Sequence, residues 1–274
     1  MSATEAALVV ETDRLTRRYG DVLAVDQVDL SVPRGAVYGF LGPNGAGKTT
    51  TLRLLLGLIR PTSGSVRLLG QPLTTASRSE LLGSVGALIE EPSLYRHLTG
   101  RENVEATRVL LGLPRASVGR VLDIVGLRAT DADRRVQGYS QGMRQRLGLA
   151  LTLLPSPRLL ILDEPANGLD PDGLQDIRDV LSRLHQEGRT TVLVSSHQLG
   201  EVERVATHIG VMRGGRLVRQ GPLADLLGQL RGLTRIRVGD STRAADALAQ
   251  RGIDASAQAD AVTLDDPSDE ATAA

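Results

Sequence analysis

"LGPNGAGKTT", residues 41–50, contains the only lysine of this chain, since every other basic residue among the 32 Lys+Arg is an arginine. Gly42 to Thr49 fit the pattern G-x-x-x-x-G-K-[ST], which is typical of a phosphate-binding loop. The apolar run VYGFL ends directly at the loop, and TTTLRLLLGLI follows it with the apolar spacing of a helix. A strand, a glycine-rich loop and a helix in this order are the context that the pattern requires.

The residue types of this loop suit a polyphosphate ligand. Glycines let backbone N–H groups turn inward, and the N-terminus of the following helix adds its positive dipole. Lys48 places a compact charge on the β- and γ-phosphates, and the Thr49 hydroxyl can ligate Mg²⁺. We therefore predict nucleotide binding by Gly42, Asn44, Gly45, Ala46, Gly47, Lys48, Thr49 and Thr50.

The retained lysine is itself informative. Arginine is also charged, but its planar fork is bulkier and prefers bidentate partners. A loop wrapped around phosphates has room for a point charge on a slim stem. A chain that otherwise uses arginine and keeps Lys48 is expected to have an active site here.

The stretch LLILDE, residues 159–164, places two carboxylates directly after a buried strand. Ligands bind at the carboxyl ends of strands in open α/β sheets, so both acids are expected to face the phosphate-binding loop. We predict that Asp163 holds Mg²⁺ through a coordinated water. We predict that Glu164 is catalytic, because it can orient and polarise the attacking water.

Short apolar segments alternate with helical ones, which predicts an α/β fold with a mainly parallel central sheet. Strands are expected at 7–12, 25–32, 36–41, 158–164 and 190–196, and a hairpin at 208–221. Helices are expected at 49–59, 172–187 and 198–206. Residues 96–154 have helical spacing without strong strand signals, so they are expected to form a helical insertion in the sheet.

We expect the chain to divide into three parts. Residues 7–222 form the main domain, with a helical subdomain at about 96–154. Residues 223–264 form a small α+β appendage, in which a helix is followed by a strand, a helix and a strand. Residues 265–274 are acidic and small, which predicts a disordered tail.

The composition argues against several classes of protein. The net charge is +0 and the arginines are scattered, so no basic face indicates nucleic acid binding. The chain contains no cysteine, which excludes thiolate metal sites and disulfides and fits a reducing cytoplasm. No signal peptide and no apolar window of about 18 residues is visible, so we expect any membrane role to need a separate partner.

Together with these two motifs, three further motifs make residues 8–222 resemble the ATP-binding subunit of an ABC transporter. YSQGM (139–143) stands where that family carries its signature motif, although Tyr139, Gln141 and Met143 depart from the commonest form. NGLD (167–170) matches the D-loop, and VLVSSH (192–197) matches the strand and switch histidine. The family implies a P-loop NTPase fold with an N-terminal antiparallel β subdomain and a helical insertion.

The resemblance also implies roles for single residues. Ser140, as the cap of the following helix, and Gly142 would face the γ-phosphate bound to the other subunit. Asp170 would lie at the dimer interface beside that subunit's ATP. His197 would contact the γ-phosphate as a catalytic residue, and Tyr19 would stack on adenine.

One position separates this chain from most of the family. Glu90, within IEEPSLYRHLTGREN (89–103), stands where a glutamine normally reaches Mg²⁺ and the attacking water. Glu90 is therefore a candidate metal ligand beside Thr49 and Asp163. The stretch is similar to that of bacitracin- and lantibiotic-immunity-type exporters and related antibiotic exporters. A register shifted by one residue would make Glu91 the relevant acid.

The resemblance implies an ATPase that uses ATP and Mg²⁺ to power export of an antibiotic, a peptide or another hydrophobic compound. Two copies, or this chain and a related ATPase, would dimerise head to tail around ATP. A separate transmembrane permease would hold them on the cytoplasmic face of the cell membrane. The alternative is a non-transport ABC ATPase acting on nucleic acid or the ribosome. Such proteins usually carry coiled-coil insertions, zinc modules or a second cassette, which this sequence lacks.

Overall fold

The computed structural model of the chain describes residues 7–90, 92–230, 234–251, 255–258 and 261–264. The chain divides into two compact units, Met1–Gln220 and Gly221–Ala274. The segment expected to be a disordered tail, 265–274, lies outside the described residues.

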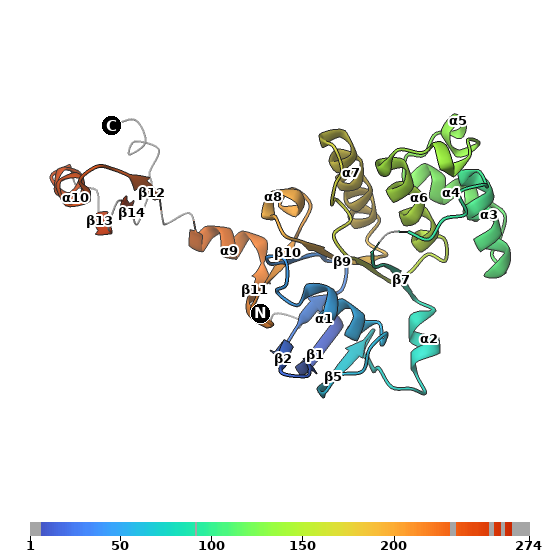
Figure 1. The fold of residues 1–274 in the computed structure, drawn as a ribbon, viewed down its shortest axis with the longest axis horizontal. Helices are drawn as coiled ribbons and strands as arrows, with labels where there is room; N and C mark the ends of the chain where they lie inside the picture. Colours follow the sequence, from blue (N-terminus) through green and yellow to red (C-terminus); the bar gives the residue numbers. More distant parts are fainter. Residues whose placement is uncertain (1–6, 91, 231–233, 252–254, 259–260, 265–274) are drawn as a thin grey trace, which may run out of the picture. The chain divides into compact units, whose positions relative to one another are not determined.

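A six-stranded sheet runs through the described part of the first unit (Figure 1). Its strand order is β11-β10-β4-β9-β8-β7. Its strands are β4 (Val37–Leu41), β7 (Val85–Leu88), β8 (Leu159–Leu162), β9 (Thr191–Ser196), β10 (His208–Arg213) and β11 (Arg216–Pro222). The pairs β10–β4, β4–β9, β9–β8 and β8–β7 are parallel. Every residue of β4, β8 and β9 is buried, which explains the apolar runs VYGFL of β4 and LLIL of β8 and the apolar centre VLV of β9. The predicted α/β fold with a mainly parallel sheet is confirmed.

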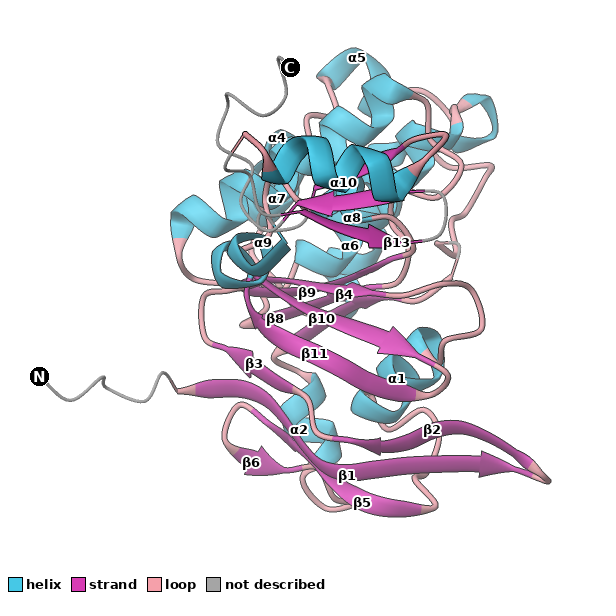
Figure 2. Ribbon diagram, turned by 90° about the vertical axis from the view of Figure 1, so that its left-hand side faces the viewer, coloured by secondary structure: helices cyan, strands magenta, loops and turns pink. Residues whose placement is uncertain are grey.

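The N-terminal part forms an antiparallel sheet with β1 at its centre (Figure 2). Its strands are β1 (Leu8–Tyr19), β2 (Val22–Val28), β3 (Ser31–Pro33), β5 (Ser63–Leu68) and β6 (Gln71–Pro72). Helix α1 (Lys48–Leu55) lies between the two sheets (Figure 2). Its Leu52 and Leu55 belong to one core with Leu15 of β1 and Phe40 of β4. This core holds the helix that follows the phosphate-binding loop against both sheets.

The N-terminal strands have different bounds from those expected. The strand expected at 7–12 continues to Tyr19, and the strand expected at 25–32 divides into β2 and β3. At the break, the Thr12 hydroxyl donates to the Val28 carbonyl oxygen (2.7 Å) and accepts from the Leu30 N–H (2.8 Å). A side chain of β1 thus satisfies backbone groups that a continuous strand would have paired in a ladder.

Helices cover the face of the central sheet opposite α1: α7 (Pro171–Glu187) and α8 (Leu199–Val202) (Figures 1 and 2). The helix expected at 198–206 is therefore shorter than its apolar spacing predicts. The Thr207 N–H donates to the Val37 carbonyl oxygen at 2.8 Å, at the point where the chain enters β10. The helix itself ends at Val202, and a turn follows it in which the Ala206 N–H donates to the Val202 carbonyl oxygen at 2.7 Å.

The expected helical insertion lies between β7 and β8. Its α-helices are α3 (Gly100–Leu110), α4 (Ala116–Ile124), α5 (Ala129–Ala132) and α6 (Gln141–Leu153). Thr99 and Glu102 form a reciprocal capping box at the start of α3. The short α5 has no signal in the sequence, whereas the other three follow the apolar spacing.

Tyr139 fills the interior of this helical insertion. The side chain is buried, and its hydroxyl donates to the Asp131 carbonyl oxygen at 2.6 Å. Gly100, the first residue of α3, lies against the ring, so that an added Cβ would overlap the Tyr139 hydroxyl. The departure from the commonest signature motif at this position is therefore a packing feature of the subdomain.

The second unit contains α9 (Leu223–Leu230), β12 (Thr234–Arg237), α10 (Ser241–Ala249), β13 (Ala255–Gln258) and β14 (Ala261–Leu264). The strands form an antiparallel sheet in the order β12-β14-β13. The expected strand, helix and strand are present, and β13 is an additional strand. Buried Val262 packs with Val238, Ala244 and Leu248. None of the described helices of the chain is long and apolar enough to cross a membrane.

Gly100→Ala is expected to lower the free energy of unfolding by about 1–3 kcal/mol, because the added methyl group overpacks the site beside Tyr139. Gly119→Ala is the matched control in the exposed part of α4, where an added Cβ meets nothing within 4 Å. That control should raise the free energy of unfolding by about 0.5–1 kcal/mol through helix propensity. Urea denaturation measures both, and equal effects would contradict the proposed packing of Gly100.

Candidate functional site

The loop between β4 and α1 is packed closely against other strands. A Cβ on Gly42 would lie 2.5 Å from the Met212 carbonyl oxygen, and one on Gly47 would overlap the Ala24 carbonyl oxygen. Gly47 also has a φ of 102°, a left-handed conformation that side-chain-bearing residues rarely adopt. Both positions therefore need glycine for steric reasons, before any ligand is considered.

This loop lines a hollow of about 400 Å³. All of residues 44–50 lie along it, together with Glu164 and Val22. Helix α1 begins at Lys48 and has no acidic residue in its first turn. The positive end of its dipole is therefore available to an anion in the hollow.

Lys48 is the most enclosed charged group of this hollow. Its Nζ atom donates to the Gly42 carbonyl oxygen at 2.6 Å and to the Pro43 carbonyl oxygen at 3.3 Å. It also lies 3.0 Å from Glu164 Oε1, and Lys48 is only 5% exposed. The lysine thus joins the phosphate-binding loop to the acid that follows β8.

Glu164 is held from both sides. His197 Nδ1 donates to its Oε2 at 2.7 Å, while Lys48 contacts its Oε1. Burial raises the pKa of Glu164, but the hydrogen bonds from His197 and Lys48 outweigh it and bring the pKa below its ordinary 4.5. The φ of Glu164 is 47°, an uncommon backbone conformation for this residue type. The carboxylate is therefore ionised and oriented at neutral pH.

Asp163 is fixed by a residue that the sequence pattern does not single out. The Ser195 hydroxyl donates to Asp163 Oδ1 at 2.6 Å and accepts from the Glu164 N–H at 2.9 Å. Ser195 belongs to β9, which lies between β4 and β8 in the sheet. The hydroxyl of Thr49 and the carboxylate of Asp163 are hard oxygen donors, a set that fits Mg²⁺.

Glu201 is a further acid beside Glu164 and His197, and the sequence pattern does not indicate it. Ligand atoms of Glu164, His197 and Glu201 lie within 4.8 Å of one another. Glu201 also accepts a hydrogen bond from the Ser196 hydroxyl. Glu201 follows His197 closely in the sequence, but its approach to Glu164 depends on the pairing of β8 with β9 and therefore on tertiary structure.

Glu90, the expected metal ligand, is ion-paired with Arg53 of α1. Arg53 is one helical turn beyond Thr49 on this helix, which places Glu90 near the phosphate-binding element. Its side chain is 66% exposed, and its φ is 69°. Glu91, the other candidate at this position, lies outside the described residues.

Ser140, Gly142 and Asp170 lie together at a different hollow of about 280 Å³. Ser140 caps α6 by accepting from the Met143 N–H at 3.2 Å, as its sequence context predicts. Asp170 caps α7 by accepting from the Gly173 N–H at 2.9 Å. The structure therefore gathers these residues into one place, but not with Lys48 and Glu164.

Tyr19 ends β1 and is 42% exposed. The guanidinium carbon of Arg17 lies 4.4 Å from the centroid of its ring. Val22, three residues further along, lines the hollow of the phosphate-binding loop. Tyr19 thus stands at the hairpin that leads into this hollow.

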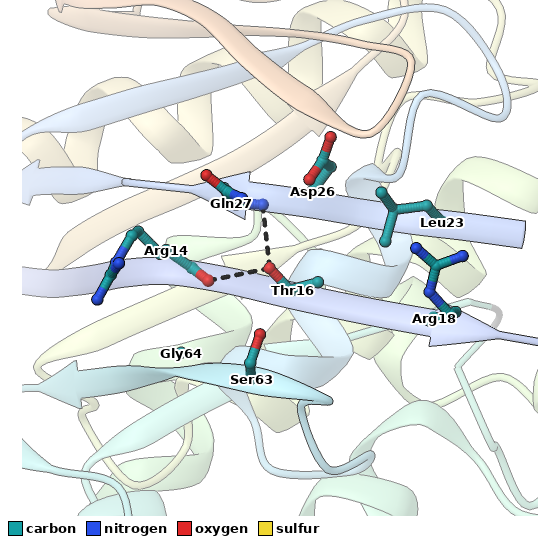
Figure 3. Close-up of a pocket in the computed structure, with 8 residues that line it drawn as sticks. All are labelled: Arg14, Thr16, Arg18, Leu23, Asp26, Gln27, Ser63 and Gly64. Carbon is teal, nitrogen blue, oxygen red and sulfur yellow. Dashed lines mark hydrogen bonds between the residues drawn. The ribbon is translucent and has the colours of Figure 1, made fainter.

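A further hollow of about 360 Å³ lies on the antiparallel sheet, among side chains of β1, β2 and β5 (Figure 3). The Thr16 hydroxyl there accepts from the Gln27 N–H at 3.1 Å and donates to the Arg14 carbonyl oxygen at 3.0 Å. Leu23 lines both this hollow and that of the phosphate-binding loop. None of the residues predicted to bind nucleotide lines it, so we assign it no role in catalysis.

The fold and the site define a P-loop ATPase. The sequence pattern of the ABC transporter family matches residues 25–167. The bacitracin transport ATP-binding protein of Enterococcus faecalis is 43% identical over 88% of this chain and 78% of its own length. The lantibiotic transport ATP-binding protein of Streptococcus pyogenes is 40% identical over 77% of this chain and 89% of its own length.

Solved structures give the same result. The structure of cbiO1 from Clostridium perfringens, part of the ABC transporter complex cbiONQ, has a TM-score of 0.74 and 27% identity. It covers 81% of this chain and 92% of its own. The chain therefore belongs to the ABC transporter family as an ATP-binding subunit. It binds ATP and is an ATPase that powers transport, and the nucleic acid alternative is not favoured.

Glu164→Gln is expected to lower the free energy of unfolding by about 1 kcal/mol at neutral pH, because the fold stabilises the ionised carboxyl. The pKa is lowered on folding, so this stabilisation is present above the ordinary 4.5 and is lost as the pH falls through the folded pKa. Urea denaturation of both proteins from about pH 7 to about pH 3.5 measures the difference. A difference that grows toward acid pH would contradict the assignment.

Proposed function

We propose that this chain drives an exporter by hydrolysing ATP with Lys48, Glu164 and His197. The observation that supports this most directly is the continuous set of contacts from Lys48 to Glu164 to His197. We also infer that residues 7–222 act as the ATPase domain and residues 223–264 as an appendage to it.

The proposed hydrolysis uses the charges of Lys48 and Glu164 and the hydrogen-bonding imidazole of His197. The γ-phosphate would contact Lys48 and His197, which would free the Glu164 carboxylate to face water. The water oxygen forms a bond to the γ-phosphorus while the bond from phosphorus to the bridging oxygen of ADP breaks. Glu164 accepts the proton of the water and later gives it to the phosphate product.

The residues proposed to hold Mg²⁺ are Thr49, Asp163 and, from the neighbouring loop, Glu90. Bound Mg²⁺ would neutralise charge on the β- and γ-phosphates. To bind Mg²⁺, Glu90 would have to leave its ion pair with Arg53. Before that, Arg53 balances the negative charge of Glu90. This ion pair gives a physical reason why an acid is tolerated where most of the family has glutamine.

We propose that two ATPase subunits, identical or related, meet head to tail around ATP. Two separate hollows support this, one with the phosphate-binding loop and one with Ser140, Gly142 and Asp170. Ser140 caps the start of α6, where backbone N–H groups and the helix dipole favour an anion, whereas Asp170 and Asp172 already place acids at the start of α7. A second subunit would bring the α6 donors to the γ-phosphate and Asp170 beside that ATP.

We propose that a separate transmembrane permease selects the cargo and holds the ATPase at the cytoplasmic face of the membrane. The loop from Glu90 to Tyr95 is the proposed contact, and the Tyr95 side chain is 56% exposed. The relatives named for bacitracin and lantibiotic transport suggest an antibiotic, a peptide or another hydrophobic compound as cargo. Purification from membranes with a polytopic subunit would test this partner.

Glu164→Gln is expected to bind ATP, to accumulate as a dimer and to lose about 10²–10⁴-fold in turnover, because the general base is removed. Phosphate release measures turnover, and light scattering measures the dimer. Glu80→Gln, an exposed acid of α2 (Arg78–Leu82), is the control and should behave as wild type. Near-normal turnover of Glu164→Gln would refute the role proposed for Glu164.

Lys48→Arg is expected to lose at least about 10-fold in ATPase rate, because the larger guanidinium cannot occupy the enclosed site between two loop carbonyls. Arg60→Lys, the reverse exchange outside the loop, serves as the control. The same phosphate-release assay applies. If Lys48→Arg kept the full ATPase rate, catalysis would not explain why this position retains lysine.

A further inference from the structure

The exposed ring of Tyr19 has an arginine on one side. The Arg17 guanidinium carbon lies 4.4 Å from the ring centroid, a distance at which a cation is attracted to an aromatic face. Arg17 is partly buried, whereas Tyr19 remains 42% exposed. One face of the ring is thus covered, and the exposed area belongs to the rest of the ring.

Arg17 is anchored independently of this contact. Its Nη1 atom donates to the Arg60 carbonyl oxygen at 2.9 Å, in the segment that follows α1. The backbone of the same segment is tied to β1, since the Thr62 N–H donates to the Thr16 carbonyl oxygen at 2.8 Å. The guanidinium is therefore tied to the chain that follows the phosphate-binding helix.

The Nε atom of Arg17 is buried and has no hydrogen-bond partner among the described residues. An unpaired buried donor carries a desolvation cost. The Arg17 side chain therefore gives up one hydrogen bond in the position that stacks it on Tyr19. The contact with the Tyr19 ring therefore explains the position of the Arg17 side chain better than its hydrogen bonds do.

We propose that Arg17 is a positioning residue for the nucleobase, which fixes the Tyr19 ring so that its free face can stack on adenine. This inference rests on the nucleotide-binding role proposed for Tyr19. The cation also draws π-electron density toward the covered face, which favours an electron-rich purine on the other. Arg17 itself does not touch the nucleotide.

The test compares two ligands of the purified full-length chain by calorimetry: ADP, and inorganic tripolyphosphate, which has phosphates but no base. Arg17→Met should weaken ADP binding about 3–10-fold relative to tripolyphosphate, and Tyr19→Ala should do so about 10-fold. Arg17→Met should add nothing further in the Tyr19→Ala background. Arg17→Lys, which keeps the charge, should recover part of the loss.

Arg18→Met is the matched control, because Arg18 is the next residue of the same strand, carries the same charge and is exposed. It should leave the ratio of ADP to tripolyphosphate affinity unchanged. Thermal denaturation checks that each variant is folded, and Arg17→Gln, which also removes the charge, replaces Arg17→Met if the latter is not.

The outcomes separate this inference from the proposed function. If the wild-type chain bound neither ADP nor tripolyphosphate, the nucleotide site itself would be refuted. A wild-type ligand ratio in Tyr19→Ala would refute the base-stacking role and this inference with it. An effect of Tyr19→Ala together with wild-type behaviour of Arg17→Met would overturn the role of Arg17 alone. The role of Arg17 would also be overturned if the double variant lost ADP affinity by the product of the two single losses, because the two residues would then act independently.

Discussion

The contact of Lys48 with Glu164 is the constraint on which the rest of the site depends. Lys48 follows β4 and Glu164 follows β8, and these strands are separated in the sheet by β9. Ser195 and His197, at the end of β9, fix the acidic pair from this middle position. Three strands that are far apart in the sequence thus place their chemistry at the same edge, where parallel sheets bind ligands.

A second consequence of the fold is that each chain carries two unlike halves of a site. The phosphate-binding half lies on α1 and the ends of the central strands. The other half, with Ser140, Gly142 and Asp170, lies where α6 and α7 begin. Ser140 caps α6 and Asp170 caps α7. At α6 the neutral Ser140 cap leaves the other N–H groups able to bind an anion, whereas the acids Asp170 and Asp172 lie at the start of α7. Separation of the halves makes association with a second subunit a natural requirement for turnover.

Arginine and lysine have different tasks in this chain. Lys48 fits between loop carbonyls because its charge is compact. Arg53 pairs with the carboxylate of Glu90, and Arg17 stacks on the Tyr19 ring while donating to a carbonyl. Both arginines use the planar, multi-donor group that lysine lacks. Arginines therefore provide the ion pair and the ring contact around the site, while the phosphate-binding loop itself uses lysine.

The sequence by itself determined the fold class and the phosphate-binding loop, because both are set by local patterns of glycine, charge and buried strands. It also determined that Ser140 caps α6, since a cap depends on a few neighbouring residues. Tertiary structure decided the contacts of Ser195 with Asp163 and of Arg53 with Glu90. These contacts join residues 30 or more positions apart, and no periodicity along the chain encodes such distances.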